Sequence, residues 1–249
     1  PPITHAVPNP SSMLTAEFQS WSFLHLATLA VCAGAAAGVS LAVKHSPDAH
    51  RRLLVRRVVG WGCIVAWMVN TAYWMMPARF DLSASLPIHF CNVANIFGAL
   101  AVLRGHRLFQ GVIYFWAGLY IWAFLTPTVG FGPAQVGFWV FWIYHAFIAL
   151  AFVHVLLVDR FRPTFRDLLH SSTFTLGYVA LLTCLDFLAG WNYGFLGNDM
   201  PGTPTPVDLL GPYPLRILWM ILCGAVAFLL LWLPFCRPAK DQSTTRTRK

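Results

Sequence analysis

The sequence predicts an all-α protein, a seven-helix transmembrane bundle with its N-terminus outside and its C-terminus in the cytoplasm. The first observation is hydropathy, because seven apolar stretches have about the 17 to 25 residues that a membrane-crossing helix needs. The second is composition, since 57% of the 249 residues are hydrophobic and 10% are charged, unlike a soluble domain. We expect one membrane domain at residues 21–236, between an outer segment at 1–20 and a basic cytoplasmic tail at 237–249.

The first three spans are predicted at residues 21–43, 58–76 and 86–103. The first span ends at a lysine, Lys44, and the second follows a run rich in arginine. The third is bounded by Arg104 on its cytoplasmic side. Charged residues stop an apolar run because they are costly to place in hydrocarbon.

The last four spans are predicted at residues 109–125, 136–158, 168–189 and 215–235. The fourth is the shortest of the seven and ends outside at Thr126-Pro127. Seven crossings place successive connections on alternate sides of the membrane. The distribution of basic residues therefore tests the assignment independently of hydropathy.

Fifteen of the 17 lysines and arginines fall on one predicted side. The other side receives only Arg79 and Arg216. Short basic loops stay in the cytoplasm, so the basic side is predicted to be cytoplasmic. We expect a multi-pass protein of the bacterial cytoplasmic (inner) membrane. The basic side carries Lys44, Arg51, Arg52, Arg56, Arg57, Arg104, Arg107, Arg160, Arg162, Arg166, Arg237, Lys240, Arg246, Arg248 and Lys249.

The net charge of +8 is spread along four cytoplasmic segments. This pattern favours anionic lipid headgroups as partners over nucleic acid. We expect membrane lipids as partners, together with other membrane subunits in one interpretation, and no nucleic acid. The six cysteines include no CxxC pair, so no disulfide framework is expected. No cofactor and no metal site are expected, because no HxxxH or HxxE spacing occurs.

Polar side chains inside the spans mark candidate functional positions, because each must be paired or face a cavity. Most of them fall in the predicted outer half, on the third, fifth and sixth spans and their outer ends. Convergence at one depth predicts a polar cavity that opens outward, while interhelical hydrogen bonding is the alternative. The candidates are His89, Cys91, Asn92, Asn95, Thr126, His145, Asp186, Asn192, Tyr193 and Arg216.

Helix geometry limits which of these residues can meet. Cys91 and Asn95 share a helix face, but His89 and Cys91 lie about 200° apart on a regular helix. From the predicted starts, His145 lies about two turns deeper than His89. Contact between the two histidines therefore requires that the fifth span begins later or tilts.

Six short motifs resemble, in order and spacing, the YwaF-like family of integral membrane proteins, whose vertebrate branch is transmembrane protein 164. The resemblance covers about residues 86–235. The motifs are Leu86-Pro87-Ile88-His89-Phe90-Cys91, Leu125-Thr126-Pro127, Tyr144-His145, Phe161-Arg162-Pro163, Trp191-Asn192-Tyr193 and Asp208-Leu209-Leu210-Gly211-Pro212.

The resemblance implies a thiol-dependent acyltransferase that acts on phospholipids. In the vertebrate branch the nucleophilic cysteine matches Ile88 of this chain, and its partner histidine matches His145. Isoleucine cannot attack an acyl group. Cys91 lies one helical turn further on and offers a thiol on nearly the same face.

Two hypotheses therefore remain open at this point. The first is a lipid acyltransferase or acyl hydrolase, in which Cys91 is the nucleophile and His145 or His89 is the base. Asp186 or Asn192 orients the imidazole. In the second, the chain is a non-catalytic accessory or lipid- or cofactor-binding subunit of a larger membrane assembly, whose outer polar cluster holds a lipid, a quinone or only its own helices. The ligand-binding candidates in both are Asn92, Asn95, Thr126, Asn192, Tyr193 and Arg216.

Two further interpretations have less support. A haem bridged by two histidines would draw on His25, His89 and His145, which would have to face one another. A small-solute carrier is the other, although no internal repeat relates the two halves of the chain.

Overall fold

The computed structural model describes residues 18–199 and 205–236, and this part of the chain is helical and contains no strand. Within these residues, six helices are long and apolar enough to cross a membrane. A seventh apolar helix, α4 (Phe90–Arg104), has 15 residues. The six are α2 (Phe23–Lys44), α3 (Ala49–Trp74), Arg107–Leu125, Val136–Val158, α9 (Phe165–Ala189) and Leu215–Phe235. The predicted helical membrane bundle is thereby confirmed.

The sequence predicted that the fourth span is the shortest. In the structure the shortest is instead the third span, α4. Residues 86–89 are not helical, and His89 has an extended backbone (φ −67°, ψ 156°) as the N-cap of α4. Pro87 keeps Leu86 out of the helix, because proline disfavours a helical conformation in the residue before it, and the extended backbone of His89 delays the start to Phe90. The loss of this first turn moves His89 off the helix.

Polar caps start two helices, α3 and α9, earlier than hydropathy predicted. α3 begins at Ala49, where the Asp48 carboxylate accepts a hydrogen bond from the His50 N–H at 2.8 Å. α9 begins at Phe165 behind a capping box in which Thr164 and Asp167 bond each other's backbone N–H groups. Caps of this kind satisfy N–H groups that the first helical turn leaves unpaired. Basic residues therefore occupy the first turns of both helices.

The fourth span is broken into three short helices, α5 (Arg107–Phe115), α6 (Ala117–Tyr120) and α7 (Trp122–Leu125). Aromatic side chains hold the broken parts together. The indole N–H of Trp116 donates to the Thr175 hydroxyl of α9 at 2.7 Å, and the Tyr120 hydroxyl donates to the Ile113 carbonyl at 3.3 Å. The break thus occurs where side chains satisfy polar groups inside the bundle.

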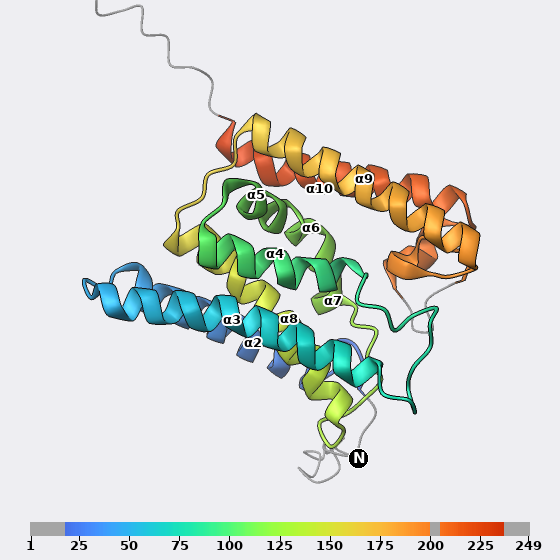
Figure 1. Ribbon diagram of the computed structural model, residues 1–249, viewed down its shortest axis with the longest axis horizontal. Coiled ribbons are helices and arrows are strands. Elements are labelled where there is room, and N and C mark those ends of the chain that lie inside the picture. The colour runs from blue at the N-terminus through green and yellow to red at the C-terminus, as the bar shows by residue number, and fades with distance from the viewer. Residues whose placement is uncertain (1–17, 200–204, 237–249) are drawn as a thin grey trace, which may run out of the picture.

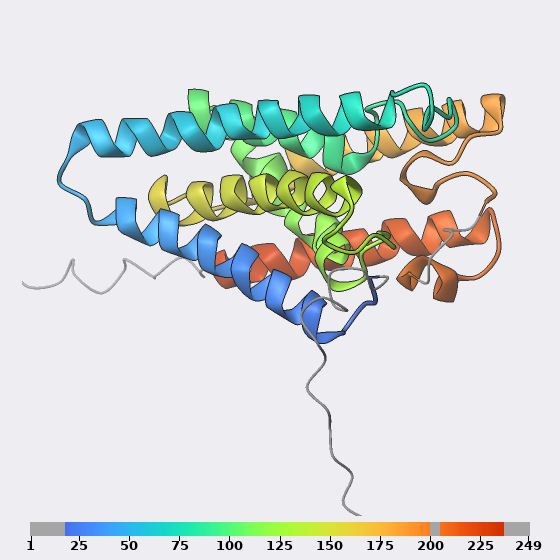
Figure 2. The same ribbon diagram turned by 90° about the horizontal axis from the view of Figure 1, so that it is seen from below.

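α4, α5 and α8 (Val136–Val153), which continues as the π-helix η1 (His154–Val158), form the centre of the bundle. α2 and α3 flank this centre on one side, and α9 with α10 (Leu215–Trp232) flanks it on the other (Figure 1). The helices run in broadly similar directions, and α2 crosses obliquely (Figure 2). Most side chains of α9 and α10 face outward, as expected for helices in contact with lipid.

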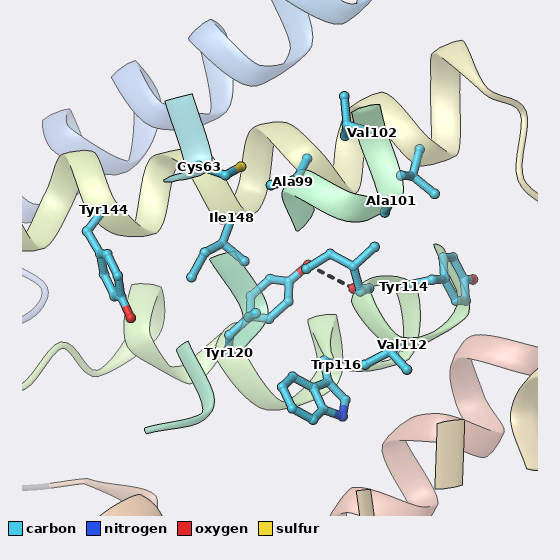
Figure 3. Close-up of a cluster of buried hydrophobic side chains, with 14 of the residues drawn as sticks. Cys63, Ala99, Ala101, Val102, Val112, Tyr114, Trp116, Tyr120, Tyr144 and Ile148 are labelled. Atoms are coloured by element: carbon cyan, nitrogen blue, oxygen red, sulfur yellow. Dashed lines mark hydrogen bonds between the residues drawn. The ribbon is translucent and has the colours of Figure 1, made fainter. Parts of the chain in front are cut away.

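Small residues allow the central helices to approach closely. A Cβ atom on Gly98 of α4 would lie 2.9 Å from the Cβ of Ala151 on the neighbouring helix α8. Ala99 and Ala101 are fully buried beside it, in the core that Figure 3 shows together with Tyr120 and Tyr144. Close approach through small residues is the usual basis of helix association in membranes, where water expulsion contributes little.

The connections alternate between two ends of the bundle. Residues 45–48, 105–106 and 159–164 lie toward one end, and residues 75–89 and 190–199 lie toward the other (Figure 1). The first end, which we call the basic end, carries the arginines that predict a cytoplasmic location. Most of the predicted outer segment and the whole predicted tail, residues 237–249, lie outside the described residues.

Candidate functional site

The candidate residues separate into two groups. Cys91 and Asn95 lie on α4 against α8, which carries His145. The remaining candidates near the non-basic end join the segment 81–89 to the segment 190–199, and we call this structure the cap. The cap contains His89, Asp186, Asn192, Tyr193 and Arg216.

Asn95 holds the α4–α8 contact. Its side-chain N–H₂ donates to the Tyr144 carbonyl of α8 at 3.2 Å and to the Cys91 carbonyl of α4 at 3.4 Å. The Asn95 side-chain nitrogen therefore links the Cys91 carbonyl of α4 to the Tyr144 carbonyl of α8, and Tyr144 precedes His145. Because Asn95 is level with Tyr144, Cys91 and His145 lie on adjacent turns of neighbouring helices.

Two buried polar atoms near this bridge have no hydrogen-bond partner among the described residues. They are Oδ1 of Asn95 and the hydroxyl of Tyr144. Tyr144 also lies close enough to Cys91 to interact with it electrostatically, as do Tyr120 and Tyr178. The Tyr144 phenol also interacts with the Asn95 side chain, so these two polar groups lie close to each other within the cluster. Sequence reasoning named Tyr144 only within the Tyr144-His145 motif and did not single out Tyr120 or Tyr178, because their spacing gives no helical or catalytic pattern.

His145 is 5% exposed and packs between aromatic rings, with centroid distances of 4.2 Å to Phe141 and 6.0 Å to Phe124. Its Nδ1 lies 2.8 Å from the Phe141 carbonyl. A carbonyl can only accept, so Nδ1 carries the proton and Nε2 carries the lone pair. Among the described residues, no hydrogen bond joins His145 to Cys91.

His89 lies in the cap, where both of its ring nitrogens have partners. Nδ1 accepts from the Gly194 N–H at 3.3 Å, and Nε2 donates to the Ala84 carbonyl at 3.1 Å. The ring also contacts Tyr193, with centroids 4.8 Å apart. His89 therefore connects two loops of the cap, and no described contact joins it to His145.

Tyr193 is fully buried at the centre of the cap. Its hydroxyl donates to the Leu82 carbonyl at 2.6 Å and accepts from the Leu86 N–H at 3.0 Å. Burial raises the pKa of the Tyr193 phenol, so the phenol keeps its proton at neutral pH and can donate. Its backbone N–H donates to Oδ1 of Asp186 at 2.9 Å, while Oδ2 of Asp186 has no hydrogen-bond partner among the described residues.

Asn192 and Arg216 fix the remainder of the cap. Asn192 accepts from the Gly197 N–H and donates to the Asp199 carbonyl, both at 2.9 Å. Arg216 of α10 is 1% exposed and donates to the carbonyls of the same two residues, Gly197 and Asp199. The contacts of Arg216 tie α10 to the segment 190–199 that follows α9.

Two of the ligand-binding candidates, Thr126 and Asn92, lie apart from the cap and from His145. Thr126 donates its hydroxyl to the Trp122 carbonyl at 3.1 Å, at the end of α7. Asn92 is buried in the first turn of α4. Neither residue contacts the cap or His145 through a hydrogen bond that the described structure contains.

A haem ligand role would require free histidine nitrogens. His25 is fully buried, its Nδ1 accepts from the Trp21 N–H at 2.8 Å, and its Nε2 donates to the Phe124 carbonyl at 2.7 Å. His25 thus ties the start of α2 to the end of α7. In residues 18–199 and 205–236, no group of three or more His, Cys, Asp or Glu side chains is placed to hold a metal ion.

The bridge between α4 and α8 leads to a first prediction. We expect Asn95→Ala to lower the unfolding free energy by about 1 kcal/mol, as interhelical polar contacts in membranes contribute roughly 0.6 to 2 kcal/mol. Thermal unfolding of the purified protein in detergent would measure this loss, with Asn70→Ala in α3 as the matched amide control. An Asn95 variant as stable as the control would contradict the bridge.

Comparison with known proteins identifies one family. The sequence model of the TMEM164 family matches residues 15–232. No curated protein and no solved structure matches the chain.

Proposed function

The chain belongs to the TMEM164 family of multi-pass membrane proteins, and from this premise we propose that it is a non-catalytic, lipid-binding subunit of a larger membrane assembly. We place it in the bacterial cytoplasmic membrane, with the cap outside and the basic end in the cytoplasm. The orientation is supported by the 15 basic residues assigned to one side of the bundle.

The main support is that the parts of a thiol-dependent active site do not contact one another. A thiol needs a base within hydrogen-bond reach to become a good nucleophile, and no base is hydrogen-bonded to Cys91 among the described residues. The position that matches the nucleophile of the vertebrate branch is Ile88, whose carbonyl accepts a hydrogen bond from Tyr178. Asp186 and Asn192 bind the backbone of the cap.

Lipid binding is supported by a groove of about 610 Å³ between α9 and α10. Its walls are apolar side chains, among them Leu176, Val179 and Ile221. Thr183 also lines the groove, and its buried hydroxyl lacks a hydrogen-bond partner among the described residues. An acyl chain fits the apolar walls, and its ester oxygen would supply an acceptor for Thr183.

Gentle detergent extraction of native membranes tests this function. We expect the chain to migrate with other membrane proteins in fixed ratio and to carry phospholipid that mass spectrometry detects. In nanodiscs that contain phospholipid and lysophospholipid, we expect no acyl transfer by the wild type and no change in Cys91→Ala. A monomer with lipid-dependent turnover would overturn the proposal.

Acyl transfer remains the second candidate, because Asn95 brings the turns of Cys91 and His145 together. Nε2 of His145 has the lone pair that would accept the thiol proton. If this candidate is correct, wild-type turnover is lost in Cys91→Ala and His145→Gln. It is kept in Cys63→Ala, which removes the buried thiol that contacts the Phe147 carbonyl.

A further inference from the structure

A pocket of about 380 Å³ lies at the basic end, between the start of α5 and the start of α9. It lies at the opposite end of the bundle from the cap, and none of the candidate residues above lines it. This volume is within the usual range for small-molecule sites. The pocket is lined by His106, Arg107, Leu108, Gly111, Thr164, Arg166, Asp167, His170 and Ser171.

The charge of this pocket is cationic. Asp167 is the only acid in its lining, and Arg107 pairs with both of its oxygens at 2.9 and 2.6 Å. Thr164 donates its N–H and its hydroxyl to the same carboxylate at 2.7 and 2.6 Å. The Arg166 guanidinium, in contrast, is exposed and makes no ion pair with a described residue. One positive charge therefore remains uncompensated beside two histidines.

An unpaired hydroxyl lies at the bottom of the pocket. Ser171 is 1% exposed, and its Oγ has no hydrogen-bond partner among the described residues. Burying such a group without a partner costs about 1 to 3 kcal/mol. Gly111 faces it, since a Cβ at that position would lie 3.2 Å from this Oγ. A side chain at position 111 would therefore crowd this hydroxyl, and glycine avoids that contact.

We propose that this pocket binds a phosphate group, either in the headgroup of an anionic phospholipid or on a soluble phosphorylated molecule. Arginine binds phosphate oxygens through its planar N–H fork. Arg166 therefore pairs with the negative charge of the phosphate, and the Ser171 hydroxyl donates to a further phosphate oxygen. α5 and α9 both begin beside this pocket, next to the predicted cytoplasmic surface. The pocket therefore lies at the depth of the headgroups. The inference does not depend on the function proposed for the outer half.

The experiment titrates the purified full chain in detergent with phosphatidic acid and, separately, with glycerol 3-phosphate, and follows the melting temperature. We expect Arg166→Gln to weaken binding about fivefold, as one arginine near an anionic lipid surface contributes about that factor. We expect Ser171→Ala to weaken binding about tenfold. The melting temperature of this variant without ligand should not fall, because its hydroxyl has no partner to lose. Gly111→Ala should weaken binding by filling the pocket.

Arg104→Gln is the matched control, because Arg104 is exposed at the same end and outside the pocket lining. It makes the same change in charge, and we expect binding to stay within about twofold. An equal loss in Arg104→Gln and Arg166→Gln would mean diffuse attraction and would overturn the site. Absence of binding by either probe would also overturn it. Binding of phosphatidic acid alone identifies a lipid headgroup, and equal binding of both probes identifies a soluble phosphate.

Discussion

Gly197→Ala is expected to disrupt the cap and to lower the unfolding free energy by about 3 kcal/mol or more. A Cβ at Gly197 would lie 1.9 Å from the backbone oxygen of Trp191 and 2.9 Å from the Cα of Asn192. Both are backbone atoms, so rotation of a side chain cannot relieve the overlap. The loop would have to open, with loss of the hydrogen bond from the Gly197 N–H to Asn192. A destabilisation of this size lowers the melting temperature by roughly 6 to 12 °C.

Gly177→Ala is the matched control for this substitution. Gly177 lies within α9, and a Cβ there would meet nothing within 4 Å. Alanine favours a helix over glycine by up to about 1 kcal/mol, so the melting temperature should stay or rise. If Gly197→Ala and Gly177→Ala have the same melting temperature, the close packing of Trp191 against Gly197 does not stabilise the cap.

The membrane fold was predictable because it depends on averages over many residues. Apolar length and the sidedness of arginines each sum over a whole span, so no single residue decides them. Helix boundaries were less predictable, since one cap can move them: Asp48 starts α3 nine residues before the apolar run that marked it. Likewise, Pro87 and the extended His89 shorten the third span. Hydropathy contains no information on these polar contacts.

The site was only partly predictable, because the order of the spans gives the depth of each polar residue in the membrane but not which side chains contact it. Polar residues in the outer half pointed to one cavity, and the structure divides them between the α4–α8 contact and the cap. Asn95 lies on a helix that meets the helix of His145. His89 and Asp186, in contrast, each bind backbone groups of a loop. Loop conformation is set by such long-range hydrogen bonds, and spacing along the chain does not encode them.

The two arginines on the predicted outer side differ in a way that sequence could not show. Arg79 is exposed and lies over the ring of Tyr73, 4.4 Å from its centroid. Arg216 is buried and donates to the carbonyls of Gly197 and Asp199. Arg216 lies on the predicted outer side, which disfavours basic residues, and these contacts give the guanidinium a structural role there. The Arg216 guanidinium donates to loop carbonyls, Gly197 and Asp199, that no helix hydrogen bond satisfies.

Arg216→Met is therefore expected to lower the unfolding free energy by about 3 kcal/mol, since hydrogen bonds to charged groups contribute roughly 1.5 to 3 kcal/mol each. Methionine keeps much of the side-chain length, so the loss reports the guanidinium and the carbonyls that it leaves unpaired. The matched control, Arg79→Met, should change the melting temperature by no more than about 2 °C, because an exposed charge contributes little. Limited proteolysis should cut residues 190–199 faster in Arg216→Met alone. If Arg79→Met were as destabilising, positive charge at this end of the bundle would be what the fold requires, and the cap contacts of Arg216 would not explain the effect of Arg216→Met.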